Sequence, residues 1–218
     1  GVDVLVGNSS YIAERIMKVW RREAEVVHPP VDVARFALAH GKQDHFLVAS
    51  RMVPYKRIEL VAEAFRRMPG RQLRIIGDGV NMPAVRAAAG DAPNISFMGR
   101  VDQPTLVREM QQAAAVIHAA EEDFGIAIVE AQACGTPMIA FARGGATDIV
   151  RPPPAPDPTG LLFPDQTADS LIAAVEQFAG MRDAFTPEAC RANAEQFSEE
   201  NFRARMQALV ARHREAAQ

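Results

Sequence analysis

Short apolar runs alternate with amphipathic helical patterns along most of the chain, and this alternation constrains the fold more than any other feature. Apolar residues between the runs recur at helical spacing, as in the series Ile58, Val61 and Phe65. Strands separated by helices of about 10–15 residues form parallel βαβ units. We therefore predict an α/β fold built on a Rossmann-like doubly wound parallel sheet. Six apolar runs have the length and composition of buried strands: Phe46–Ala49, Leu73–Ile76, Ile95–Met98, Val116–His118, Met138–Phe141 and Gly160–Phe163.

Both ends of the chain depart from this alternation. Residues 1–32 predict a strand at Val2–Val6, a helix that begins at an N-cap within Asn8–Ser10, and a linker in which two prolines halt a strand-like run. Residues 33–185 form the predicted sheet domain, and residues 186–218 are expected to be helical. The predicted organisation is one large domain with an additional segment at each end.

The chain begins with Gly1 and runs at once into an apolar strand. We therefore expect a piece of a longer protein, cut near a domain boundary. The proline-dense stretch 151–158 predicts an extended loop. This loop is either a stiff surface connection or a polyproline segment that docks a partner domain.

Composition excludes several functional classes. Apolar residues make up 48% of the 218 residues and charged residues 23%, which argues against a disordered chain. A net charge of −3 argues against nucleic acid as a partner. No apolar run approaches the roughly 18 residues that a membrane helix needs. Cys134 and Cys190 lie far apart in the sequence, which suggests neither a disulfide framework nor a metal site, so the expected compartment is cytoplasmic.

In open parallel sheets, ligands bind outside the carboxyl ends of the strands, so the residues that follow each predicted strand are candidates for a site. The first strand is followed by three cations, Arg51, Lys56 and Arg57, in a loop that leads into a helix. Arginine binds phosphate through two donors, lysine adds a point charge, and a helix N-terminus attracts anions. This loop is either a diphosphate site or a solvated basic loop.

The next two strands end in glycine-containing turns. Gly77-Asp78-Gly79 begins like a dinucleotide fingerprint, but Met82 occupies the position of its third glycine. The turn is therefore a weak signal for a nicotinamide cofactor and a reasonable one for close backbone approach. Gly99-Arg100-Val101 could expose backbone groups to a flat ligand.

The fourth strand leads into three consecutive carboxylates, Glu121, Glu122 and Asp123. Acids can cap the N-terminus of the helix that follows, which would explain this triplet. Capping does not explain Glu130, an acid among apolar residues of a helix that reads as buried and therefore in need of a partner. Sugar hydroxyls would be suitable donors. Because they are eight positions apart, Glu122 and Glu130 would lie roughly 12 Å from each other along a helix and could contact two sugars of one ligand.

The remaining candidates are individually weaker. The pair Gly144-Gly145 permits either close ligand approach or an ordinary turn. His28 and His118 are expected to be packed or hydrogen-bonded side chains, and Cys134 a small core residue. A metal site is not expected, because the acidic run contains no histidine and its spacing does not bring two acids onto one helix face.

Taken in order, these stretches resemble a known family. The matching elements are Arg51 with Lys56, Gly77-Asp78-Gly79, Phe97-Met98-Gly99-Arg100-Val101, Glu122-x-Phe124-Gly125 with Glu130-Ala131, Ala133-Cys134-Gly135-Thr136-Pro137, Gly144-Gly145 and Thr159-Gly160-Leu161-Leu162. They resemble the C-terminal, donor-binding half of the retaining glycosyltransferases of family 4, which have a GT-B fold. The likeness is greatest to mannosyltransferases of polysaccharide assembly, and it departs from the family pattern at Asp148, where a glutamate is common.

The resemblance implies a catalytic group of three residues. Arg51 and Lys56 would hold the donor diphosphate without a metal ion, and Glu122 would contact hydroxyls of the transferred hexose. The diphosphate would leave from the face on which the acceptor attacks, with retention of configuration, and the two cations and a helix dipole would stabilise its charge.

The resemblance also implies donor-binding residues around this group. Glu130 would hold the ribose hydroxyls, and Arg100 and Val101 would meet the base through their backbone. The other implied donor-binding residues are Phe124, Gly125, Ile126, Gly77, Gly144 and Gly145.

The implied function is donor binding in a hexosyltransferase, with GDP-mannose as the expected nucleotide sugar and no other cofactor. The acceptor, a saccharide or a lipid-linked saccharide, would bind to an N-terminal domain outside this chain. Residues 1–32 would be the end of that domain and its linker, and residues 186–218 would pack back toward it. The full-length enzyme could associate peripherally with a membrane. Two alternatives stay open: a nicotinamide-dependent dehydrogenase domain, and a nucleotide-binding interaction module without catalysis.

Overall fold

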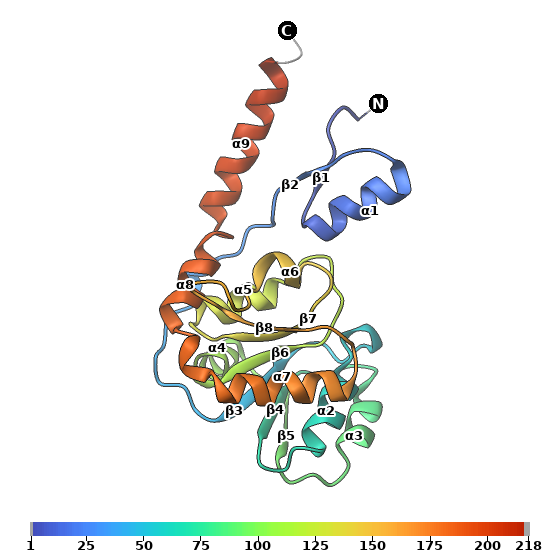
Figure 1. Ribbon diagram of the computed structural model, residues 1–218, viewed down its shortest axis with the longest axis vertical. Coiled ribbons are helices and arrows are strands. Elements are labelled where there is room, and N and C mark those ends of the chain that lie inside the picture. The colour runs from blue at the N-terminus through green and yellow to red at the C-terminus, as the bar shows by residue number, and fades with distance from the viewer. Residues whose placement is uncertain (1, 216–218) are drawn as a thin grey trace.

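A single six-stranded parallel sheet forms the centre of the computed structural model, which describes residues 2–215 (Figure 1). The strand order is β5-β4-β3-β6-β7-β8, so the order reverses direction between β3 and β6. A crevice opens at the carboxyl edge of a sheet at such a reversal, which is where ligands bind in this architecture. The strands are β3 (His45–Ala49), β4 (Gln72–Ile76), β5 (Ile95–Gly99), β6 (Ala115–His118), β7 (Met138–Phe141) and β8 (Gly160–Phe163).

Helices cover both faces of this sheet, as predicted for a doubly wound fold (Figure 1). One buried cluster joins α2, α3 and α7 to side chains such as Phe46 and Val48, and the other joins α4, α5, α6 and α8 to the intervening Leu47. Successive residues of a buried strand thus enter opposite cores. The helices are α2 (Ile58–Arg66), α3 (Met82–Ala89), α4 (Gln103–Gln112), α5 (Ile126–Ala133), α6 (Ala146–Ile149), α7 (Ala168–Gly180) and α8 (Pro187–Glu195), with short 3-10 turns η1 (Val33–Arg35), η2 (Pro54–Lys56) and η3 (Arg182–Ala184).

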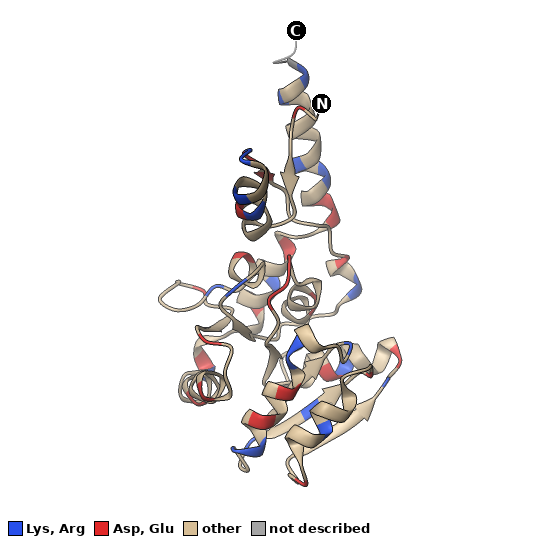
Figure 2. Cartoon of the chain, turned by 90° about the vertical axis from the view of Figure 1, so that its right-hand side faces the viewer, with Lys and Arg blue, Asp and Glu red and all other residues tan. Residues whose placement is uncertain are grey.

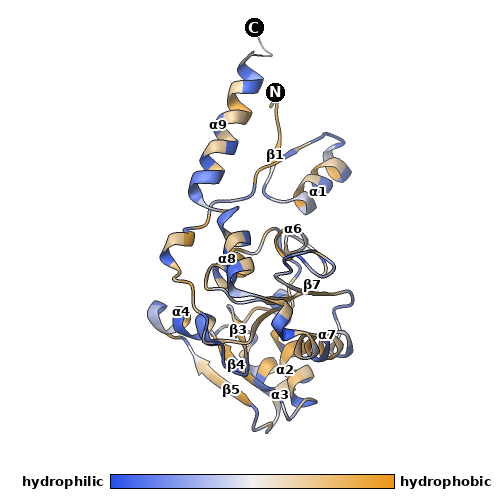
Figure 3. Cartoon of the chain, turned by 60° about the vertical axis from the view of Figure 1, so that its left-hand side comes forward, coloured by the Kyte–Doolittle hydropathy of each residue, from blue (hydrophilic) through white to orange (hydrophobic). Residues whose placement is uncertain are grey.

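All six predicted strands are present, each within one residue of its expected bounds. Their apolar runs are continuous because both faces are covered, and Figure 3 shows this hydrophobic colour concentrated in the strands and on the helix faces turned toward them. Cys134 and Cys190 are both buried, and burial raises the pKa of their thiols to about 11 and about 12. Cys134 is a core residue, as predicted.

The N-terminal part forms a small separate layer, here called the N-terminal unit: β1 (Val6–Gly7), α1 (Ser10–Trp20) and β2 (Glu25–Val26). The expected strand at Val2–Val6 is wrong in its bounds, because parallel pairing with β2 begins only at Val6. The expected N-cap is correct, since the Ser9 hydroxyl accepts a hydrogen bond from the Ile12 amide.

The C-terminal region consists of α8 and α9 (Glu199–Glu215), with a break between them. At that break the linker and the C-terminal segment lie side by side, because Val31 pairs with Ser198 and the Val31 amide donates to the Phe197 carbonyl over 2.9 Å. Helix α9 then runs alongside the N-terminal unit, where His213 Nε2 lies 2.7 Å from Glu25 Oε1 (Figure 1). Gly1 and residues 216–218 of the predicted terminal segments lie outside the described residues. None of the helices within residues 2–215 has the length and apolar character needed to span a bilayer.

Candidate functional site

The loops after β3, β4, β5 and β6 converge at the carboxyl edge of the sheet, next to the point where the strand order reverses. They line two adjoining pockets that together contain most of the residues predicted from the sequence. In Figure 2, a stretch of loop coloured as acidic residues lies where the sheet domain faces the N-terminal unit.

The segment Glu121–Gly125, here called the acidic loop, directs its three carboxylates to two sides. The Tyr11 hydroxyl donates to Glu121 Oε1 over 2.7 Å, and Arg15 Nη1 lies 3.2 Å from Asp123 Oδ1, so both outer acids contact α1. The middle acid, Glu122, pairs instead with side chains of the sheet domain. The expectation that these acids cap a helix is wrong, because the N-cap of α5 is Gly125 and no side chain bonds there.

Glu122 lies between a cation and a histidine. Lys56, at the end of η2, donates to Glu122 Oε1, and His118 Nε2 lies 3.2 Å from Glu122 Oε2. The three side chains are only 16%, 19% and 11% exposed, in the order Lys56, Glu122, His118. Burial lowers the pKa of His118 to about 4, against the opposing effect of Glu122, so this imidazole is neutral at pH 7. The prediction that His118 is a packed polar residue is confirmed.

The first pocket surrounds Lys56 and Glu122 and has a volume of about 660 Å³. The acidic loop and the first turn of α5 form one wall of this pocket, and the other wall includes Asn8 and Pro29 from the N-terminal part of the chain. The sequence analysis missed these two residues. Asn8 directly follows β1, and Pro29 lies three residues after the end of β2. Applying the strand-end rule to the N-terminal unit would therefore have found Asn8. The complete lining is Asn8, Pro29, Tyr55, Lys56, Glu121, Glu122, Asp123, Phe124, Gly125, Ile126 and Ala127.

The second pocket has a volume of about 620 Å³ and lies between the ends of β3, β4 and β5 and helix α5. It brings together Arg51, Glu130, Arg100 and Val101, which the sequence assigned to one ligand. Ala127 lines both pockets, so the N-terminus of α5 is their shared boundary. The complete lining is Ala49, Ser50, Arg51, Val53, Ile76, Gly77, Asp78, Gly79, Val80, Arg100, Val101, Leu106, Met110, Ala127 and Glu130.

Glu130 is a half-buried acid on α5. Burial raises its pKa, and the positive charge of Arg35 opposes that shift. The expected separation of Glu122 and Glu130 along one helix is wrong, because α5 begins only at Ile126 and Glu122 precedes it. The two acids nevertheless face different, adjoining pockets, as two contacts to one extended ligand would require.

Three of the predicted donor-binding glycines have a structural reason of their own. A side chain at Gly77 would collide with the Ser50 carbonyl, and its φ of +124° favours glycine. Side chains at Gly144 and Gly145 would collide with the backbone of the acidic loop, and the Gly145 amide donates to the Glu122 carbonyl over 2.8 Å. The backbone that comes close to each of these glycines is thus another segment of the same protein. Gly77 also lines the second pocket, whereas Gly144 lines a smaller one of about 280 Å³ beside α1.

Among residues 2–215, no group of three or more histidine, cysteine, aspartate or glutamate side chains is placed to hold a metal ion.

Comparison with known proteins identifies the family. The family described as "Glycosyl transferases group 1" matches residues 31–197. This range includes all of the six-stranded sheet and helix α5, which borders both pockets. The chain belongs to this family. The match confirms the resemblance seen in the sequence and argues against the dehydrogenase alternative.

Group 1 relatives extend the match over nearly the full chain. It is 30% identical to a D-inositol 3-phosphate glycosyltransferase of Jonesia denitrificans, over 98% of this chain and 58% of that protein. It is 32% identical to a GDP-mannose-dependent monoacylated alpha-(1-6)-phosphatidylinositol monomannoside mannosyltransferase of Corynebacterium glutamicum, over 78% of this chain and 51% of that protein. The chain therefore spans little more than half the length of these curated relatives.

Solved structures show the same fold. Sucrose-phosphate synthase from Thermosynechococcus elongatus superposes with a TM-score of 0.80 at 23% identity, over 100% of this chain and 60% of that one. Anabaena HepE, solved in complex with UDP and glucose, superposes with a TM-score of 0.78 at 19% identity, over 96% of this chain and 63% of that one. The α/β domain with its six parallel strands is thus one half of a GT-B fold.

Proposed function

We propose that this chain is the donor-binding domain of a retaining hexosyltransferase and that it binds a nucleotide sugar across the two pockets. The observation that carries this proposal is the shared boundary at the N-terminus of α5, with Glu122 in the pocket on one side and Glu130 in the pocket on the other. The nucleoside would occupy the second pocket, with its ribose on Glu130 and its base against Arg100 and Val101. The hexose would occupy the first pocket, against Glu122.

The diphosphate would lie where the pockets meet. Arg51 lines one pocket and Lys56 the other, and the N-terminus of α5, at the boundary that the two pockets share, adds a partial positive charge. When the bond to the sugar breaks, negative charge grows on the departing diphosphate, and preorganised cations and amides at that position stabilise it. No step in this scheme requires a metal ion.

GDP-mannose is the donor we propose. The support is the Corynebacterium relative, whose name states GDP-mannose dependence, while HepE was solved with UDP and UDP-glucose. A nucleotide base that is bound mainly by backbone groups is not identified by the side chains around it. Choosing between GDP-mannose and UDP-glucose therefore needs a binding measurement.

The acceptor belongs to a further proposal about the whole enzyme. We propose that a saccharide or lipid-linked acceptor binds to an N-terminal domain preceding this chain, of which residues 1–32 are the end, and that residues 186–218 pack back toward it. The 218-residue chain would then bind donor while transferring little sugar, and the full-length enzyme could work at the cytoplasmic face of a membrane.

Calorimetric titration of the chain with GDP-mannose, UDP-glucose, ADP-glucose and NADH tests the proposal. We expect binding of one nucleotide sugar, with GDP-mannose strongest, and weaker binding in Arg51→Gln and Lys56→Gln. Lys18→Gln removes an exposed lysine from α1 and serves as the matched control. If every nucleotide and nucleotide sugar fails to bind a folded chain, the proposal is wrong.

A further inference from the structure

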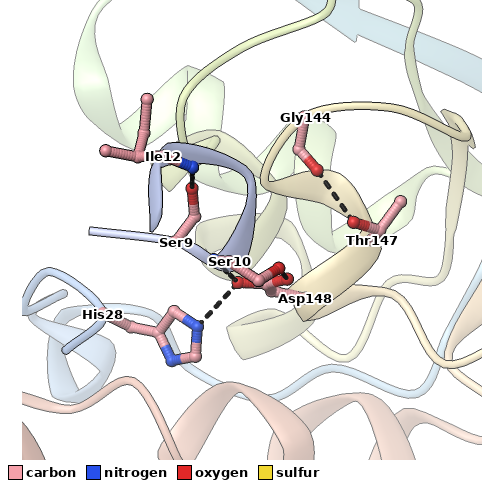
Figure 4. A network of polar contacts seen from close by, with 7 residues as sticks. All are labelled: Ser9, Ser10, Ile12, His28, Gly144, Thr147 and Asp148. Atoms are coloured by element: carbon pink, nitrogen blue, oxygen red, sulfur yellow. Dashed lines mark hydrogen bonds and ion pairs between the residues drawn. The ribbon is translucent and has the colours of Figure 1, made fainter. Parts of the chain in front are cut away.

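Three features of the sequence have no role in the donor scheme: the outer acids of the acidic loop, Asp148 after the paired glycines, and His28 in the linker. The structure brings all of them to the contact between the N-terminal unit and the sheet domain, beside the first pocket. Figure 4 shows Asp148 and His28 at this contact. The second pocket is built by the sheet domain alone and has no such neighbours.

Asp148, on α6, is the centre of this contact. It accepts a hydrogen bond from the Ser10 amide at 2.7 Å and another from the Ser10 hydroxyl, at the first residue of α1. His28 Nε2 lies 2.9 Å from the same carboxylate, and the Asp148 and His28 side chains are only 11% and 19% exposed. Figure 4 shows these three side chains directed toward one another from three different segments.

The carboxylate of Asp148 is held in its charged form. Burial would raise its pKa, but the hydrogen bonds from His28 and Ser10 outweigh burial and lower the pKa. A charged Asp148 can only accept hydrogen bonds, so Nε2 of His28 carries a proton. The carboxylate also lies at the N-terminus of α1, where a helix favours negative charge. These contacts hold α1 on the sheet domain.

Helix α1, held in this way, reaches the acidic loop from one side. Tyr11 bonds to Glu121 and Arg15 contacts Asp123, one residue on each side of Glu122. His28 also stacks on Phe124 of the same loop, with ring centroids 5.6 Å apart.

On its other side the acidic loop is held by the turn that precedes α6. The Gly145 amide bonds to the Glu122 carbonyl over 2.8 Å, and Asp148 follows three residues later. The contacts thus form a closed ring from the acidic loop through Gly145 to Asp148, then through Ser10 and α1 back to the acidic loop.

We propose that Asp148 and His28 are positioning residues that, by docking α1, hold the acidic loop so that Glu122 faces the first pocket. This inference rests on the proposed function only in taking Glu122 as the residue that contacts the sugar. The outer acids and the histidine are then explained together: they fix the direction of the middle acid, and they couple the placement of the N-terminal unit to the sugar end of the site.

Hydrogen exchange of the 218-residue chain without any ligand tests the coupling. In Asp148→Asn we expect peptides from α1 and from residues 119–126 to exchange about tenfold faster, because a hydrogen-bonded buried charge is lost. Asp91→Asn, which removes an exposed carboxylate from the turn after α3, is the control and should change neither. Faster exchange in α1 alone, or in neither region, would overturn the proposal.

A second pair of variants separates positioning from general destabilisation. His28→Gln keeps a donor near the position of Nε2, whereas His28→Leu removes it. We expect the ratio of GDP-mannose affinity to GDP affinity to fall about threefold or more in His28→Leu, with GDP affinity unchanged, and to recover in His28→Gln. An unchanged ratio in a folded His28→Leu, or equal loss of both affinities, would contradict the role of His28. If the unaltered chain binds neither nucleotide, the proposed function fails, and the exchange measurement still decides the coupling.

Discussion

The two pockets of this domain are similar in volume but differ in how they are built. The second pocket is lined by sheet-domain residues alone, and its charged side chains are Arg51, Asp78, Arg100 and Glu130 among mostly apolar neighbours. The first pocket contains charges that already pair with one another, and its walls include Asn8 and Pro29 from outside the sheet domain. Nucleoside binding should therefore be a property of the sheet domain, whereas sugar recognition should depend on how the N-terminal unit is placed.

The largest effect should come from displacing the backbone that lines the second pocket. Gly77→Ala places a side chain against the Ser50 carbonyl at a φ of +124°, so the loop after β3 must shift. We expect a loss of about 3 kcal/mol in the free energy of unfolding, measured with urea, together with loss of nucleotide binding. Gly70→Ala, where a new side chain meets open space, should leave both unchanged.

The next effect is specific to the first pocket and depends on pH. The pKa of His118 is about 4 in the folded chain and about 6.5 when unfolded, so the unfolded chain binds more protons between these values. Stability should therefore fall as pH falls through this window, by about 2 kcal/mol between pH 7 and pH 5 from this group. His118→Gln should remove that part of the pH dependence in urea titrations. A variant with the same slope as the unaltered chain would show that His118 titrates normally.

Comparing Glu122→Ala with Glu130→Ala tests whether the first pocket binds the sugar and the second pocket binds the nucleoside. We expect Glu130→Ala to weaken GDP and GDP-mannose by the same factor, about tenfold, because it removes a charged acceptor from the ribose. Glu122→Ala should weaken GDP-mannose by a similar factor and leave GDP unchanged. Calorimetry of both ligands on both variants measures this, and the reverse pattern would exchange the assignments of the two pockets.

The smallest effect should come from the exposed contact between α1 and the acidic loop. Arg15 and Asp123 are 58% and 60% exposed, so solvent screens their attraction. We expect Arg15→Gln to change the free energy of unfolding by less than about 0.5 kcal/mol. A larger loss would mean that the exposed pair, and not Asp148, is the main attachment of α1.

The sheet could be predicted from the sequence because each central strand is buried on both faces and reads as a continuous apolar run. Val2–Val6 reads as a similar, mostly apolar run, yet only Val6–Gly7 pairs, with the two residues of β2. Local composition cannot report the length of a partner elsewhere in the chain.

The sequence pointed to residues that line the two pockets, and their roles there stay predictions, but it did not predict their geometry. Arg51, Lys56, Glu122 and Glu130 were all found by looking at strand ends and at a misplaced acid, and the structure places them around two adjoining pockets. The direction of each carboxylate in the acidic loop was not predictable, since it is decided by partners about 110 residues away, such as Tyr11. The contacts of Asp148 with Ser10 and His28 could not be predicted for the same reason.

The pairing of Val31 with Ser198 has a consequence for how the two parts of the molecule can move. A single peptide linker permits rotation about every axis, but here two chain segments cross between the parts and are hydrogen-bonded to each other. Twisting about the direction of the crossing would shear that bond, whereas bending across both segments would preserve it. We therefore expect the two parts to rotate relative to each other about one axis only. Any opening or closing of the first pocket should be a rotation about that axis.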